Sequence, residues 1–245
     1  MTQPPAPPAE HVDRVLCVLA HPDDVDFGSA GTVATWTDAG TEVVYCLVTD
    51  GDAGGFDDTP RDQMGPLRRA EQTAAAAHVG VTQLHWLGYP DGRVEQTLEL
   101  RRDIARVIRQ VRPDRVVTTS PERMWDRVGA SHPDHMTVGE ATLRAVYPDA
   151  RNPFAFPELL ADEGLEAWTV SEVWLSASPR AHHAVDVTDT AERKFAALES
   201  HVTQVSHQPE GQLREFVGGW MRQTARTHGL PDGRLAEAFQ IVHTA

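Results

Sequence analysis

The sequence predicts an α/β fold, a Rossmann-like, mostly parallel and doubly wound sheet with flanking helices and a C-terminal strand and helix extension. Two observations predict it. Short apolar runs alternate with helix-length amphipathic segments as far as residue 147, which is typical of βαβ units with parallel strands. Polar, chemically reactive residues follow two of those runs, and open α/β sheets bind ligands beyond the carboxyl ends of their strands.

Each expected strand is a short apolar run bounded by polar, Gly or Pro residues. The first run, VLCVL, precedes a His-Pro turn, and the second ends before Asp50-Gly51. The third ends at the turn GYPDG, and the fourth follows Pro113. Later runs alternate in polarity and should extend or cap the sheet. We expect strands at 15–19, 43–49, 84–87, 115–119, 170–177, 183–187 and 238–242.

Helices are expected where apolar residues recur at helical spacing or where Ala, Glu and Arg dominate. Gly40 and Gly80 mark the ends of the first two, since glycine commonly follows the last helical residue. We expect helices at 30–39, 67–79, 98–111, 136–147, 189–203 and 213–228. The Gly- and Asp-rich segment 52–64 is expected to be a flexible loop and a candidate lid, and 148–168 is expected to be irregular.

The bulk composition predicts one globular domain. The chain has 245 residues, 40% of them hydrophobic, and a formal net charge of −14. We expect residues 1–10, rich in Pro and Ala, to be a disordered tail, and 11–245 to be a single domain. The negative charge argues against nucleic acid as a partner. No run is long and apolar enough to span a membrane, and residues 1–10 do not resemble a signal peptide, so we expect a cytoplasmic protein.

Two His-Pro-Asp tripeptides carry the candidate chemistry, and each follows an expected strand. The first, at 21–23, is followed by Asp24, and the second, at 132–134, is followed by His135. In the common doubly wound order the first and fourth strands are neighbours, so both motifs should reach one crevice. Two histidines and one carboxylate with open positions are a catalytic zinc pattern. Either motif alone fits a turn or a helix cap, but their joint occurrence favours a metal site.

With these motifs and several others, the chain resembles the LmbE-like (PIG-L) zinc-dependent N-acetylglucosaminyl deacetylases. The run AHPDD matches the first motif of that family, and HPDH matches its second metal motif. The turn LGYPDG and an Arg-bearing helix also match. The matching segments are 20–24, 27–32, 49–51, 68–71, 87–92, 132–135 and 187–204.

The resemblance implies a zinc-dependent hydrolase that uses metal-activated water to remove an acetyl or other acyl group. The substrate would be a small molecule, with the acyl group on the amide nitrogen of an amino sugar or glycoconjugate. The implied ligands of one Zn²⁺ per chain are His21, Asp24 and His135. The sequence leaves open whether the site binds another divalent metal, because the order of metal affinities alone does not determine which metal a protein holds. The sequence also leaves the oligomeric state open, a homo-oligomer included.

The resemblance also assigns roles to individual residues. The implied catalytic residues are Asp23 as general base, His132 as the group that stabilises the oxyanion and helps the amine leave, and Asp134, which would orient His132. Arg68 and Asp91 would contact hydroxyl or phosphate groups of the substrate. These roles agree with the need for a base beside the metal and a second group that meets the developing charge.

Several alternatives stay open at the level of sequence. Val25 stands where many family members have Glu, and Ala130-Ser131 stands where some have an aromatic residue. Both departures concern substrate recognition, so an amidase acting on a thiol conjugate or on a natural-product intermediate is an alternative. A nucleotide-binding Rossmann-like module is another. A module of that kind typically has the motif Gly-x-Gly-x-x-Gly after the first strand, whereas this chain has HPDD there.

Overall fold

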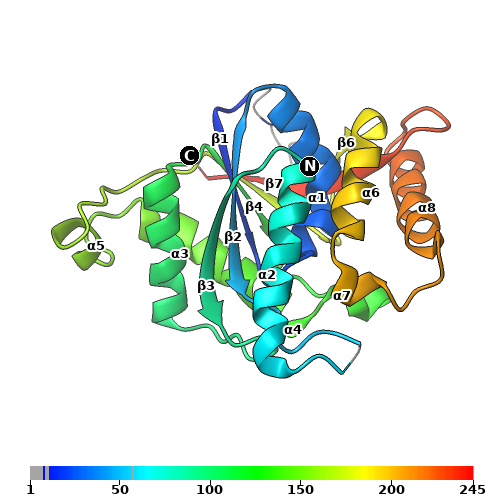
Figure 1. Ribbon diagram of the computed structural model, residues 1–245. Coiled ribbons are helices and arrows are strands. Elements are labelled where there is room, and N and C mark those ends of the chain that lie inside the picture. Colours follow the sequence, from blue (N-terminus) through cyan, green and yellow to red (C-terminus); the bar gives the residue numbers. More distant parts are fainter. Residues whose placement is uncertain (1–7, 9–10, 57, 245) are drawn as a thin grey trace.

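The computed structural model describes residues 8, 11–56 and 58–244, and within them the chain forms a seven-stranded sheet with helices on both faces (Figure 1). The strands are β1 (Arg14–Leu19), β2 (Glu42–Thr49), β3 (Gln83–Tyr89), β4 (Arg115–Thr119), β5 (Glu172–Ser176), β6 (His183–Asp186) and β7 (Ala236–His243). Their order is β3-β2-β1-β4-β5-β7-β6. The first five are parallel, and β7 is antiparallel to both β5 and β6. The predicted fold class is therefore confirmed, and β1 and β4 are neighbours as expected.

The helices mostly lie where the sequence places them. They are α1 (Asp24–Asp38), α2 (Arg61–His78), α3 (Leu98–Val111), α4 (Pro133–Arg144), α5 (Glu158–Ala161), α6 (Ala191–Glu199), α7 (Val202–Val205) and α8 (Gln212–Thr227). Further helical turns are η1 (Trp125–Ala130), η2 (Ala145–Ala150) and η3 (Thr188–Thr190). Three of the helices, α1, α2 and α4, begin earlier than expected, and the expected helix 189–203 is divided into a short turn and two helices. The first turn of α1 contains Asp24 and Asp26, whose charges are favourable at a helix N-terminus. Because α2 starts at Arg61, part of the expected loop 52–64 is helical.

Two apolar layers cover the two faces of the sheet. On one face, Leu100 and Ile104 of α3 and Val138 of α4 pack against β1, β2 and β4. On the other, α1 and α2 contribute Val33 and Ala75 among others. A smaller cluster joins α6 to α8 beyond α1. The parallel strands β1, β2, β4 and β5 are buried on both faces, which explains their largely apolar sequences, whereas the edge strand β3 is only half-buried. None of the described helices is both long and apolar enough to cross a membrane.

The segment 148–168, expected to be irregular, contains the short helix α5 and lies at the amino ends of the strands. Trp168 donates its indole N–H to the carbonyl of Pro113 at 2.8 Å, just before β4. The guanidinium of Arg14, at the start of β1, lies 6.0 Å from the Trp168 ring centroid. Phe154 is 87% exposed. Since the two His-Pro-Asp motifs follow the carboxyl ends of β1 and β4, this segment lies at the opposite edge of the sheet from them. The expected tail, 1–10, lies outside the described residues except for residue 8.

Candidate active site

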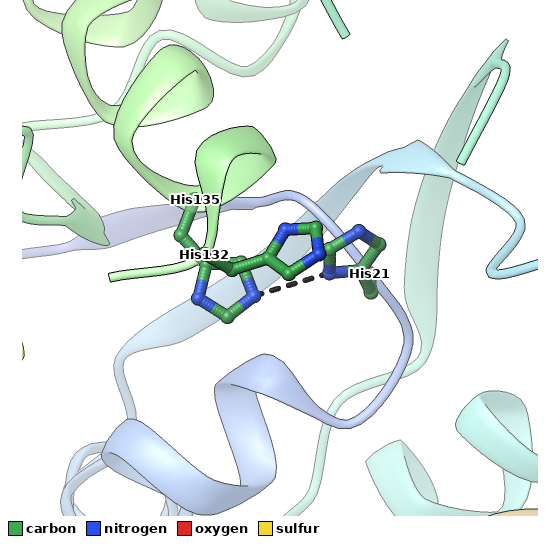
Figure 2. A group of neighbouring side chains, drawn as sticks. All are labelled: His21, His132 and His135. Atoms are coloured by element: carbon green, nitrogen blue, oxygen red, sulfur yellow. Dashed lines mark hydrogen bonds between the residues drawn. The ribbon is translucent and has the colours of Figure 1, made fainter. Parts of the chain in front are cut away.

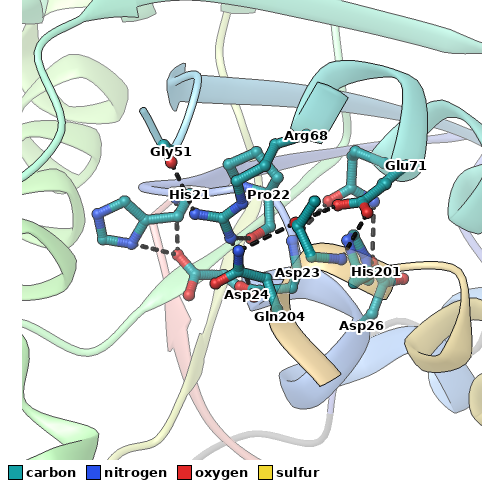
Figure 3. Close-up of polar contacts among 12 residues, drawn as sticks. His21, Pro22, Asp23, Asp24, Asp26, Gly51, Arg68, Glu71, His201 and Gln204 are labelled. Atoms are coloured by element: carbon teal, nitrogen blue, oxygen red, sulfur yellow. Dashed lines mark hydrogen bonds and ion pairs between the residues drawn. The ribbon is translucent and has the colours of Figure 1, made fainter. Parts of the chain in front are cut away.

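The turn between β1 and α1 holds the first motif in a strained conformation. Asp23 has φ 88° and ψ −25°, a left-handed geometry that is unfavourable for a residue with a Cβ. Its backbone N–H donates to Gln72 Oε1 at 2.8 Å, and its carboxylate accepts from Arg68 Nη2 at 3.0 Å. The same Arg68 nitrogen donates to the Pro22 carbonyl at 2.6 Å, as Figure 3 shows. Two side chains of α2 therefore hold the turn in place.

The three side chains expected to bind the metal lie close together. His21 Nδ1 lies 3.1 Å from His135 Nε2, and His135 Nε2 lies 2.9 Å from Asp24 Oδ1. His21 Nδ1 lies 3.5 Å from the other Asp24 oxygen. A tetrahedral zinc with bonds of 2.0–2.1 Å has ligand atoms about 3.3 Å apart. The chemistry of the donor set therefore fits zinc, and the three separations lie close to that value, with the two histidines facing different oxygens of Asp24.

The far nitrogen of His21 is held by two carboxylates. His21 Nε2 lies 2.9 Å from Asp91 Oδ1 and 3.2 Å from Asp134 Oδ2. Asp134 also accepts the Gly92 backbone N–H at 2.7 Å. Carboxylates in this position fix the orientation and tautomer of a metal-ligating histidine. Burial lowers the pKa of His21, but Asp134, Asp24 and Asp91 outweigh it and raise this pKa to about 12. The surroundings of this imidazole therefore favour positive charge.

His132 completes a group of three imidazoles (Figure 2). Its ring centroid lies 5.0 Å from that of His21 and 5.2 Å from that of His135. His132 caps α4, and its Nδ1 accepts the backbone N–H of Asp134 at 3.2 Å. Neutral imidazole has one N–H, so that proton is on Nε2. Burial, together with the charges of His21 and His135, lowers the pKa of His132.

The resemblance implies that Asp134 orients His132, but the Asp134 carboxylate does not contact that ring. Only its backbone N–H contacts His132, whereas its carboxylate contacts His21. The physical reason is its position in the first turn of α4, where its N–H points back to the cap residue. Besides His21, His132 and His135, the described residues bring together a second group of metal-type donors, His21, Asp91 and Asp134, within 4.8 Å.

The adjacent aspartates have opposite electrostatic surroundings. Burial raises the pKa of Asp23 to about 6, even though Arg68 favours its charged form. Burial would also raise the pKa of Asp24, but His135 and His21 hold it well below its usual range. Two neighbouring carboxylates whose surroundings move their pKa values apart suit different chemical roles.

Arg68 and Asp91, the expected substrate contacts, are tied to the same loops. Arg68 is 4% exposed and donates from Nη1 to the Gly51 carbonyl at 3.1 Å. A Cβ at Gly51 would come closer than 3.0 Å to the Arg68 guanidinium, so the close approach of this loop requires glycine. Asp91 accepts the Ala53 backbone N–H at 3.0 Å in addition to its contact with His21. Arg68 and Asp91 therefore also help to position the expected metal ligands.

Sequence reasoning missed a buried polar network behind Asp23. Gln72 donates to Asp26 Oδ2 at 2.9 Å, and His201 Nε2 lies 2.8 Å from the same oxygen. Gln72, Asp26 and His201 are all 0% exposed. His201 lies within the segment 187–204, one of those that carry the family resemblance. A signal for Gln72 was its spacing, one turn after Arg68 on the same helix, which places both on one face.

Comparison with known proteins places this geometry in context. The family model described as "PIG-L: GlcNAc-PI de-N-acetylase" matches residues 16–146. Diacetylchitobiose deacetylase from Thermococcus kodakarensis is 32% identical over 96% of this chain and 85% of that protein. A 1D-myo-inositol 2-acetamido-2-deoxy-alpha-D-glucopyranoside deacetylase from Mycobacterium sp. (strain JLS) is 31% identical over 83% of this chain and 78% of that protein. The solved structure of N,N'-diacetylchitobiose deacetylase from Pyrococcus horikoshii, in complex with an inhibitor, has a TM-score of 0.85 at 29% identity. The match covers 95% of this chain and 84% of the Pyrococcus horikoshii chain.

Proposed function

The chain belongs to the PIG-L family of GlcNAc-PI de-N-acetylases, and from that premise we propose that it uses one Zn²⁺ to remove the acetyl group from an N-acetylated amino sugar or glycoconjugate. Family membership makes it a hydrolase of the de-N-acetylase type. The observation that carries the proposal is the convergence of His21 Nδ1, His135 Nε2 and the Asp24 carboxylate at 2.9–3.5 Å. Relatives named as deacetylases of diacetylchitobiose and of a GlcNAc-inositol support the substrate class.

His21, Asp24 and His135 are the proposed zinc ligands, with Asp91 and Asp134 holding the far side of the His21 ring. Zinc, when bound, lowers the pKa of a water molecule and polarises the amide carbonyl. The carboxylates that face His21 supply negative charge that stabilises a cation bound at this position.

Asp23 is the proposed general base. Its Oδ2 is held by Arg68, which leaves Oδ1 to take a proton from the attacking water. The water oxygen forms a bond to the carbonyl carbon, the carbon–nitrogen bond breaks, and the nitrogen leaves as an amine after it receives a proton. The products are acetate and the free amino sugar. The Gln72 contact and the ion pair with Arg68 fix the carboxylate where it can carry that proton.

His132 is proposed to stabilise the charge that develops on the carbonyl oxygen. Its Nε2–H is available because its Nδ1 is occupied by the backbone N–H of Asp134. Asp134 therefore positions His132 through its backbone and His21 through its side chain. Arg68 and Asp91 are proposed to contact sugar hydroxyl groups while they hold the surrounding loops.

Two variants separate binding of the metal from turnover. We expect Asp23→Asn to retain zinc and to lose activity by a factor of about 10²–10⁴, the usual contribution of general-base catalysis. We expect His135→Ala to lose both zinc and activity. The measurements are the zinc content of the purified protein and amine release from N-acetylglucosamine, diacetylchitobiose and a GlcNAc-inositol.

The exposed Asp126→Asn is the matched control and should behave as the wild-type chain. Near-full activity of Asp23→Asn would refute the general-base assignment. Full zinc content in His135→Ala would refute the ligand assignment. Lack of amine release from every acetylated sugar would refute the function.

A further inference from the structure

A cavity of about 410 Å³ opens beside the proposed metal ligands, with Asp24 and His135 in its wall. Most of the remaining wall comes from the carboxyl ends of β4 and β5, from α8 and from β7. Its apolar lining residues include Phe27, Met124, Ala177, Phe216, Trp220 and Met221. This volume is typical of a small-molecule site, and it is more than ten times the roughly 30 Å³ that one water molecule occupies. The methyl group of an acetamide would therefore leave most of it empty.

Two buried charges in the wall, those of Lys194 and Glu237, neutralise each other. Lys194 Nζ donates to Glu237 Oε1 at 2.6 Å and to the Phe27 carbonyl at 2.7 Å. Glu237 in turn accepts the backbone N–H groups of Gly31 and Thr32 at 3.0 and 2.8 Å. This pair offers a ligand no net charge, so together with the apolar lining residues this part of the wall suits an uncharged, apolar group. At the rim, the exposed Arg127 lies with its guanidinium carbon 4.9 Å from the Trp220 ring centroid.

The cavity and the proposed sugar contacts lie on opposite sides of β1. Arg68 and Asp91 belong to the segments that follow β2 and β3, and these strands lie on one side of β1. The cavity lies at the ends of β4 and β5, on the other side. The two substituents of a trans amide point in opposite directions. If the sugar contacts Arg68 and Asp91 while the amide carbon lies at the metal ligands, the acyl chain points into the cavity.

We propose that this cavity binds the N-acyl chain, so that the enzyme prefers amino sugars with linear acyl chains of about four to eight carbons, a length that the volume accommodates. This inference rests on the proposed function and deepens it. The reaction is unchanged: water adds to the amide carbon, the carbon–nitrogen bond breaks, and a longer carboxylate leaves in place of acetate.

The test uses the zinc-loaded full chain and a series of glucosamines N-acylated with acetyl, butanoyl, hexanoyl and octanoyl groups. Each methylene buried in the apolar wall should raise kcat/KM by roughly fourfold, up to hexanoyl. A profile that is flat or falls beyond acetyl would overturn the inference while leaving deacetylation intact. If no member of the series is hydrolysed, the proposed function fails, and calorimetry still tests the cavity. Hexanoate should bind more tightly than acetate, and equal affinities would overturn the inference.

Two substitutions on α8 test whether this cavity causes the preference for longer acyl chains. Thr224 lines the cavity from α8, so Thr224→Trp should fill it and lower the ratio of hexanoyl to acetyl kcat/KM by at least about tenfold. Glu215, also on α8, is exposed and lies outside the described lining residues, so Glu215→Trp should leave that ratio unchanged. If Thr224→Trp instead lowered activity only on N-acetylglucosamine with a long alkyl group at the anomeric oxygen, the cavity would bind the aglycone and the inference would be wrong.

Discussion

Asp23 and Asp24 are adjacent, yet their carboxylates face different partners. Asp24 contacts the two histidines, whereas Asp23 contacts Arg68. The left-handed backbone at Asp23 is what turns the two side chains apart, because α1 begins immediately after it. Such a conformation persists only where surrounding contacts hold it. Gln72, which accepts the Asp23 backbone N–H, is therefore a positioning residue for the proposed base.

Gln72→Leu tests that role at a single residue. The variant removes the acceptor for the Asp23 N–H and leaves Asp26 without one of its donors, so we expect the free energy of unfolding to fall by about 1–3 kcal/mol. Because Asp23 loses its fixed position, kcat should fall by about tenfold or more, with zinc content and KM little changed. The measurements are steady-state kinetics, metal analysis and urea denaturation.

Gln63→Leu is the matched control, since Gln63 is exposed on the same helix. It should leave kcat unchanged. A Gln72→Leu protein that is less stable but keeps the wild-type kcat would show that Gln72 stabilises the fold without positioning the base.

The elements behind the site are joined by the buried ion pair of Lys194 on α6 with Glu237 on β7. Both side chains are almost fully buried, at 0% and 3% exposure. Glu237 also accepts two N–H groups of α1. One carboxylate therefore connects α1, α6 and β7, and these elements form part of the cavity wall. Removing one partner of such a pair leaves an uncompensated buried charge.

Lys194→Met should lower the free energy of unfolding by about 3–5 kcal/mol. The double variant Lys194→Met/Glu237→Gln should recover part of that loss, because a neutral amide oxygen still accepts an N–H of α1. Chemical denaturation of both proteins measures the difference. Equal free energies of unfolding for the single and double variants would show that the uncompensated charge of Glu237 does not cause the loss.

The whole molecule places the site where three segments distant in sequence meet. The β1–α1 turn provides His21 and Asp24, the start of α4 provides His135, and the turn after β3 provides Asp91. A metal that binds His21, Asp24 and His135 only in the folded state stabilises that state by mass action. The fold and the proposed metal site are thus energetically linked.

Zinc at about one hundred times its dissociation constant should raise the free energy of unfolding by about 2.7 kcal/mol. A chelator should reverse this gain. The gain should persist in Asp23→Asn and disappear in His135→Ala, as measured by thermal unfolding with and without zinc. A gain of equal size in His135→Ala would show that zinc binds elsewhere in the chain.

The sequence by itself determined the α/β fold, the extent of α3 and the pairing of the two His-Pro-Asp motifs at neighbouring strand ends. These features depend on local patterns, namely apolar runs, helical spacing and turn residues, which are present in short segments. The earlier starts of α1, α2 and α4, and the position of 148–168 at the far edge of the sheet, depend on contacts with other elements.

Only the tertiary structure decided which partners the site residues have. It turned the Asp134 carboxylate toward His21, brought Gln72, Asp26 and His201 together behind Asp23, and formed the cavity between α8 and the ends of β4 and β5. The physical reason is that hydrogen bonds and cavities join residues far apart in sequence. Their formation depends on the packing of whole elements, which no local pattern records.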